Sequence, residues 1–312
     1  MVEQRGDGLG AGFRGDAVEA AQALGEDYGK VEGRTQREIV WRRFRRHRLA
    51  LVGGIILVLL YAAALATPVI APYEFDEPDY AAINRGPSAE HPMGTDRLGR
   101  DELTRVLYGG RVSLMVGLGV GLFATVTGAA FGIVSGYYGR FVDVGTSGLV
   151  DFVLVLPFIP MLMVLGSIYQ FTAITITFIL VLLLWPRMAR LVRGQVLAIR
   201  GEEYVQAAKA IGVSNFKIML RHILPNVVGI MVVEATLLVA YAILVESAIS
   251  YLGFGIQPPT PSWGNLLQDS RSTMTSQWWL TWFPGLMIVV TTLCVNFLGD
   301  GLRDALDPKA LK

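Results

Sequence analysis

The chain has 312 residues, of which 53% are hydrophobic and 17% are charged, whereas an average soluble domain carries about a quarter charged residues. Because the apolar residues are grouped in long runs, this composition excludes an ordinary soluble domain. The formal net charge of +1 identifies no partner, and a single cysteine, Cys294, excludes an internal disulfide.

The apolar runs predict membrane spans. A span needs about 20 mostly apolar residues. Suitable windows lie at residues 49–71, 112–137, 144–168, 171–185, 227–251 and 280–298. Six spans place both termini on one side, so we expect an all-α membrane protein. The polar first 33 residues predict a disordered tail, and no cleavable signal peptide is recognised before the first run.

The distribution of basic residues predicts the orientation. Seven arginines lie in residues 34–48, directly before the first span, and residues 187–221 are also basic. By the positive-inside rule both segments are cytoplasmic. We therefore expect a cytoplasmic tail at 1–48, an extracytoplasmic segment at 72–111, a core of five spans at 112–303 with an outer loop at 252–279, and a cytoplasmic end at 304–312. An interfacial aromatic belt is predicted from the tryptophans on the outer side, Trp263, Trp278, Trp279 and Trp282.

The second span is rich in glycine, reading GLGVGLFATVTGAAFGIVSGYYG at residues 117–139. Small residues let membrane helices approach each other closely. We favour this packing interpretation over the alternative of a flexible gate.

The outer segments contain residues that stiffen the chain. Gly94 and Gly99 allow tight turns, and Asp101 and Arg105 have the spacing of an i,i+4 pair on a short helix. The sequence PPTP at 258–261 predicts a stiff extended stretch. Such a surface suits docking of a rigid partner, and the alternative is a cap that closes the outer mouth of the bundle.

Ionisable residues inside the spans are costly and often functional. Asp151 is expected to form a structural or gate-linking ion pair with an arginine such as Arg140, Arg187 or Arg190, and the alternative is contact with a substrate. Glu246 either contacts a substrate amino group or braces the outer loop, and both roles stay open for Glu234. The three histidines, His47, His91 and His222, lie outside the spans, and no spacing predicts a metal site.

The loop between the fourth and fifth spans, EEYVQAAKAIGVSNFKIMLRHILPN at 202–226, predicts two short helices. Helical spacing gives the first an apolar face of Tyr204, Ala207, Ala208 and Ile211. The opposite face carries Glu202, Glu203, Gln206 and Lys209. Gly212 permits a left-handed backbone that ends this helix, and Ser214 or Asn215 is expected to cap the second.

The second helix is expected to place Phe216, Met219, Leu220 and Ile223 on one stripe and to end at Pro225. The apolar face of the first helix is too small for insertion into a bilayer surface. It suits docking into the groove of a protein.

The sequence disfavours three other classes of protein. Residues 145–148, GTSG, fit the short GxSG pattern of rhomboid proteases, but no span carries a histidine that could serve as the base for Ser147. A secondary carrier would show inverted repeats, and none is evident. No P-loop is present, so the chain itself is not expected to hydrolyse ATP.

Several motifs resemble one family. The alanines 207–208, Gly212 and the LP at 224–225 resemble the EAA loop of ABC-importer permeases. Gln206 stands where that family usually has glutamate, and His222 where isoleucine is common. HPMGTDRLGRDELTRVLYGGRVSL at 91–114 and YLGFGIQPPTPSWGNLL at 251–267 resemble the dipeptide and oligopeptide permeases, in particular their C-type subunit. The likeness covers residues 40–305.

The resemblance implies a type I ABC importer permease fold with six transmembrane helices and a cytoplasmic coupling helix. It implies a subunit that forms half of a pathway for di- or oligopeptides delivered by a solute-binding protein, with nickel chelates, heme, glutathione or sugars as alternative substrates. The implied partners are a second permease, two ATPase subunits that bind ATP and Mg, the binding protein and membrane lipid. Nucleic acid is not expected, nor is a cofactor or metal in this chain. The implied location is the bacterial cell membrane.

The resemblance also implies roles for particular residues. Docking to the ATPase falls to Glu202, Glu203, Tyr204, Gln206, Ala207, Ala208, Ile211 and Gly212. Docking of the binding protein falls to Asp96, Arg97, Arg100, Pro258, Pro259 and Trp263. The candidates for translocation or gating are Asp151, Glu234 and Glu246.

Overall fold

A computed structural model describes residues 36–306 of the chain. The predicted tail at 1–33 lies outside the described residues. Helix α2 (Gln36–Phe44) lies at the boundary between two units of the chain, which divide after Arg42. Every later helix belongs to the second unit.

The second unit is built from helices. The long ones are α3 (Arg48–Ile70), α4 (Glu102–Tyr138), α5 (Arg140–Val155), α6 (Phe158–Ile168), α7 (Ala173–Ile199), α10 (Leu224–Tyr251) and α12 (Trp278–Leu306). The short ones are α8 (Glu203–Ala210), α9 (Asn215–Ile218), the π-helical turn η1 (Met219–Ile223) and α11 (Trp263–Ser270). Among residues 36–306, β-pairing is limited to two isolated bridges. The expected all-α class is confirmed.

Within residues 36–306, five helical segments are long and apolar enough to cross a membrane, and the count is six if α5 and α6 together form one span. These two helices are bent by 75° at Leu156 and Pro157. Leu156 is extended, as the residue before a proline prefers, and Pro157 has no N–H with which to continue α5. The predicted third span is therefore broken.

Several spans extend beyond their predicted ends, among them α4, α7 and α12. Helix α4 begins at Glu102 instead of residue 112, because Asp101 caps it by accepting a hydrogen bond from the Thr104 N–H at 2.8 Å. The fourth span, predicted at 171–185 with an extension towards Arg190, continues as α7 to Ile199, so the arginines up to that point lie on a helix and not in a loop.

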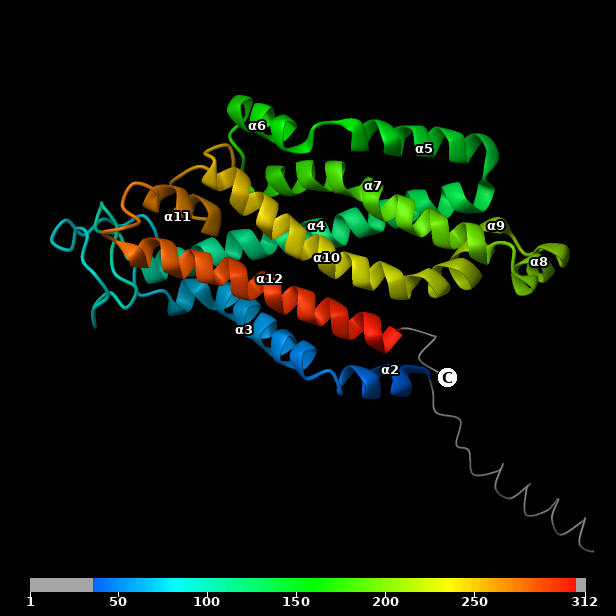
Figure 1. Ribbon diagram of the computed structural model, residues 1–312, viewed down its shortest axis with the longest axis horizontal. Coiled ribbons are helices and arrows are strands. Elements are labelled where there is room, and N and C mark those ends of the chain that lie inside the picture. Colours follow the sequence, from blue (N-terminus) through cyan, green and yellow to red (C-terminus); the bar gives the residue numbers. More distant parts are fainter. Residues whose placement is uncertain (1–35, 307–312) are drawn as a thin grey trace, which may run out of the picture. The chain divides into compact units, whose positions relative to one another are not determined.

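Glycines of α4 allow close contact with α7, which lies alongside it (Figure 1). A Cβ added to Gly132 would lie 2.6 Å from the carbonyl oxygen of Ala189, and one added to Gly128 would lie 2.6 Å from that of Trp185. Real side chains do not approach backbone atoms so closely. The packing interpretation of the glycine-rich span is confirmed.

Gly132→Leu is expected to force α4 away from α7, at a cost of about 1–3 kcal/mol for overpacking. The measurement is the midpoint of unfolding of the detergent-solubilised protein. Gly148→Leu on α5 is the control, because a Cβ there meets no atom within 4 Å. Equal midpoints for the two variants would contradict the close-packing role.

The predicted helix end at Pro225 is wrong. Helices α9, η1 and α10 run together from Asn215 to Tyr251. In the wider π turn the Leu224 N–H donates to the carbonyl of Met219, five residues back. Pro225 follows closely after this π turn, whose wider winding accommodates a proline inside the continuous helix.

Candidate functional site

Helices α8 and α9 form a small unit at the end of the bundle opposite α11 (Figure 1). Three residues join α8 to α7, and η1 joins α9 to α10. Gly212 lies between the two short helices with φ of +80°, as predicted. The Gln206 side chain donates to the carbonyl of Arg200 at 2.8 Å, which ties α8 to the end of α7.

The expected apolar face of α8 is partly wrong. Ala208 is buried in the chain's own core, together with Val205, so it is not available to a partner. Tyr204, Ala207 and Ile211 are exposed, and Ile211 has 81% of its surface free. The free face of α8 therefore centres on Ala207.

The other members of the expected α8 site, Glu202, Glu203, Gln206 and Gly212, are all exposed. The predicted stripe of the second helix is divided. Met219 and Ile223 are buried, whereas Phe216 and Leu220 are exposed beside the free face of α8. Ser214 occupies the N-cap position of α9 without a side-chain cap bond.

Polar contacts connect this unit to α4. The Tyr137 hydroxyl donates to the Asn215 side chain at 2.8 Å. The Lys209 ammonium lies 5.0 Å from the centre of the Tyr137 ring, within cation–π range. A displacement of α8 would therefore move the ends of three helices: α4 through these contacts, and α7 and α10 through the chain itself.

Three arginines of α7 form ion pairs with acidic residues of neighbouring helices. The distances are 2.7 Å for Arg187–Glu234, 2.6 Å for Arg190–Asp151 and 2.5 Å for Arg193–Asp143. The expected pairing of Asp151 with an arginine is confirmed, and its partner is Arg190. Glu234 is paired with Arg187 from α7.

Glu246 is fully buried and acts as a brace for the loop before α11. The Ser113 and Ser250 hydroxyls donate to its carboxylate at 3.0 and 2.8 Å. Ser113 Oγ in turn accepts from the backbone N–H of Trp263 at 3.3 Å, and Ser250 Oγ accepts from that of Ile256 at 3.1 Å. Of the two roles left open for Glu246, this geometry favours bracing, because no surface of the side chain is free for a substrate.

A buried network of charges joins the segment before α4 to α11. Asp96 accepts from Arg100 and from Arg105, each at 2.7 Å. Arg105 also donates to Asp269 of α11 at 3.1 Å. The expected pair of Asp101 and Arg105 is wrong, because Asp101 faces the helix N-terminus and the His91 ring, 2.9 Å away.

Half of the expected binding-protein docking residues are inaccessible. Asp96 and Arg100 are buried in this network, and Trp263 is buried against α4, where its indole N–H donates to the Val106 carbonyl at 3.0 Å. The residues that remain exposed are Arg97, Pro258 and Pro259. Arg97 and Pro258 line an open hollow of about 530 Å³, to which Arg97 and Arg271 contribute positive charge and Asp269 negative charge.

The expected aromatic belt is also only partly present. Trp278 and Trp282 are exposed. Trp263 and Trp279 are buried, and the Trp279 indole donates to the Thr95 carbonyl at 3.2 Å. The buried pair holds loops in place and does not face lipid.

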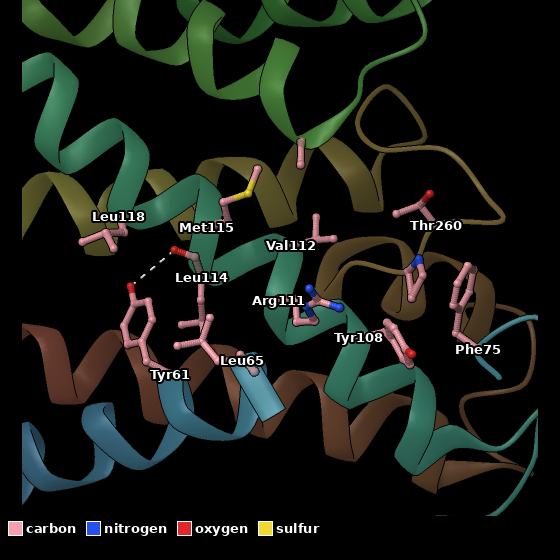
Figure 2. A pocket seen from close by; sticks show the side chains of 13 residues that line it. Tyr61, Leu65, Phe75, Tyr108, Arg111, Val112, Leu114, Met115, Leu118 and Thr260 are labelled. Atoms are coloured by element: carbon pink, nitrogen blue, oxygen red, sulfur yellow. Dashed lines mark hydrogen bonds between the residues drawn. The ribbon is translucent and has the colours of Figure 1, made fainter. Parts of the chain in front are cut away.

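A largely apolar cavity of about 420 Å³ lies between α3 and α4. Figure 2 shows Tyr61 and Leu118 toward one end, Phe75 and Tyr108 toward the other, and Arg111 between them. The Arg111 guanidinium lies 5.9 Å from the centre of the Tyr108 ring. The cavity therefore combines apolar walls with one cation.

The described residues do not contain the serine and histidine arrangement that the rhomboid-protease alternative requires. The Ser147 hydroxyl contacts the Asp143 carboxylate at 3.4 Å. His91 is paired with Asp101, and the His222 ring faces Tyr204 at 6.4 Å. Within residues 36–306, Ser147 forms no hydrogen bond to a histidine, and no group of residues there has the composition of a metal site.

The chain is a helical membrane bundle with an exposed helical unit at one end and braced loops at the other. Known proteins have similar sequences. Residues 128–312 match the family model described as "Binding-protein-dependent transport system inner membrane component". Residues 35–87 match "N-terminal TM domain of oligopeptide transport permease C".

Similar proteins cover most of the chain. The oligopeptide transport system permease protein OppC of Escherichia coli K12 is 43% identical over 90% of this chain and 93% of its own length. The dipeptide transport system permease protein DppC of Alkalihalophilus pseudofirmus is 40% identical over 86% of this chain and 88% of its own. OppC of Mycobacterium bovis is 38% identical over 89% and 96%. The chain therefore belongs to the family of binding-protein-dependent transport system inner membrane components, and it is a multi-pass membrane permease.

Proposed function

We propose that the chain is one of two permease subunits of an ATP-driven importer for di- or oligopeptides. The single observation that carries the proposal is the exposed α8 face, centred on Ala207, in a chain whose relatives are named as dipeptide and oligopeptide permeases. Nickel chelates, heme, glutathione or sugars are the alternative substrates, and competition against labelled peptide uptake distinguishes them.

The proposed complex contains a second permease, two ATPase subunits and a solute-binding protein. ATP and Mg are bound by the ATPase subunits. This chain forms part of the translocation pathway and is not itself an enzyme. Its termini and α8 lie in the cytoplasm of a bacterial cell, following the arginines at 34–48. The binding protein docks at the opposite end, over Arg97, Pro258 and Pro259.

Helix α8 transmits the closure of the ATPase to the spans. It occupies a groove of the ATPase subunit and moves with it when ATP draws the two ATPases together. The three residues to α7 and the continuous helix from α9 into α10 carry this movement into the bundle. ATP thereby favours the outward-open state, because the complex binds ATP more tightly in that state than in the inward-open state.

Gly212→Val is expected to uncouple ATP hydrolysis from peptide uptake in the reconstituted complex. A β-branched residue resists positive φ, at a cost of about 1–2 kcal/mol for the left-handed conformation, and α8 would change its orientation to relieve it. Gly212→Asn tolerates this conformation and is expected to retain uptake.

A second control separates backbone strain from the added side chain. Gly194 of α7 also has open space around it but no positive φ, so Gly194→Val is expected to retain coupling. Uptake at the normal rate by the Gly212→Val complex, with all subunits assembled, would count against the proposed role of α8.

A further inference from the structure

Asp151 and Arg190 are charged groups on spanning helices, and both are more than half exposed. Their side chains keep 63% and 59% of their surface free while they form an ion pair at 2.6 Å. Asp151 lies in the apolar sequence LVDFVLV of α5. Ionised groups at such positions face a water-filled cavity or another protein, because lipid does not solvate them.

The arginines of α7 form a stripe along the helix. Arg187, Arg190 and Arg193 are spaced by three residues, so each step along the stripe rises by about 4.5 Å and turns by about 60° around the helix. This rotation directs Arg187 to Glu234 of α10 and the other two to α5. The stripe therefore follows the seam where α7 meets α5 and α10.

A polar hollow of about 270 Å³ lies at this seam and is lined by residues of α4, α5 and α7. Its lining combines the charges of Asp151, Arg190 and Arg193 with the hydroxyls of Ser135 and Ser147. Because liquid water takes about 30 Å³ per molecule, the hollow has room for several waters. We call it the α5–α7 hollow.

We propose that the α5–α7 hollow lines the translocation pathway and binds the charged ends of a peptide, with Arg190 receiving the terminal carboxylate and Asp151 the terminal ammonium. A peptide with free ends carries both charges, and the ion pair offers both complements. Exposed ion pairs contribute little stability, so Asp151 and Arg190 can separate and each can pair with a charged end of the peptide instead. This proposal rests on the proposed function and adds the place of substrate contact.

The position of the hollow also links it to α8. Arg190 lies on α7, which leads through three residues into α8, whereas Asp151 lies on α5. A movement of α8 that carries α7 with it would change the separation of the pair. The affinity of the pair for the peptide ends would then differ between the inward-open and outward-open states of the complex.

The first test measures access of water to the hollow in the reconstituted complex. Ser147→Cys and, as control, Leu149→Cys are introduced separately into a Cys294→Ser background, since Cys294 is the only native cysteine. A charged, membrane-impermeant thiosulfonate is applied from the α8 side. Because the control side chain points about 200° away around α5, the Ser147 variant is expected to react roughly tenfold faster or more, since only a hydrated thiolate reacts.

The second test uses the peptide itself. A dipeptide with free ends, added from the α8 side, is expected to slow modification of the Ser147→Cys complex severalfold. The same dipeptide with an acetylated N-terminus and an amidated C-terminus is expected to leave the rate unchanged. Asp151→Asn combined with Arg190→Gln is expected to abolish the difference between the two dipeptides.

Two results would overturn the proposal. The first is equal reactivity of the Ser147 and Leu149 variants, which would mean that the second permease or lipid covers this face. The second is equal protection by the free and the blocked dipeptide. Either result with ATP-driven peptide uptake intact would leave the proposed function standing, whereas absence of uptake by the unmodified complex would remove that function itself.

Discussion

Arg105→Ala is expected to destabilise the protein by about 3–5 kcal/mol, the cost of removing one partner from a buried ion pair. Arg105 is almost fully buried and bonds Asp96 at 2.7 Å and Asp269 at 3.1 Å. With Arg100 these residues form a network of two arginines and two aspartates. Without Arg105, one negative charge would be left uncompensated between the segment before α4 and α11.

The measurement is the unfolding midpoint of the purified protein in detergent, together with its yield as a monodisperse species. Arg105→Lys keeps the charge but loses the fork that reaches two carboxylates, so an intermediate loss is expected. Arg97→Ala is the matched control, because Arg97 is a nearby arginine that is exposed and absent from the network. A loss for Arg105→Ala no larger than that for Arg97→Ala would contradict the structural role of the network.

Ala207→Glu is expected to abolish co-purification of the ATPase subunit while leaving the chain folded. Ala207 is exposed at the centre of the free face of α8, between Tyr204 and Ile211. A charge placed there would be buried in the ATPase groove without a partner, which costs several kcal/mol, roughly a thousandfold or more in affinity. The measurement is the amount of ATPase recovered per permease.

Two further variants define what such a loss means. Ser214→Glu adds the same charge at the exposed N-cap position of α9, outside α8, and is expected to retain the ATPase, because an acid is favourable at a helix N-terminus. Ala208→Glu places a charge in the chain's own core and is expected to lower the yield of folded permease instead. Normal recovery of the ATPase with Ala207→Glu would remove α8 as the docking element.

The apolar centres of the spans could be predicted from the sequence, but their ends could not. A span predicted from hydropathy ends where polar residues begin. The helices continue through such residues, since Glu102 lies within α4 and Arg193 within α7. Both are tolerated there because tertiary structure covers or pairs them, as Asp143 pairs with Arg193. Such partners come from distant parts of the chain and leave no local signal.

The same limit applies to the two loop regions. Helical spacing placed Ala207 and Ala208 together on one face of α8, but contact with the rest of the chain decides which of two adjacent alanines is free. Trp263 and Asp96 lie in segments that are polar enough to suggest an exposed surface, yet folding of those segments onto α4 buries both side chains. By contrast, the positive φ of Gly212 followed from local chemistry alone, and the structure has it.

The most direct test of the central claim is a pull-down of the full chain from its native membrane in mild detergent, with mass spectrometry of the proteins that accompany it. The account predicts a second, similar permease and ABC ATPase subunits in stoichiometric amounts, with a solute-binding protein recovered after cross-linking. Recovery of the chain alone, or only with copies of itself, would contradict the account, because the exposed face of α8 would then have no ATPase to engage.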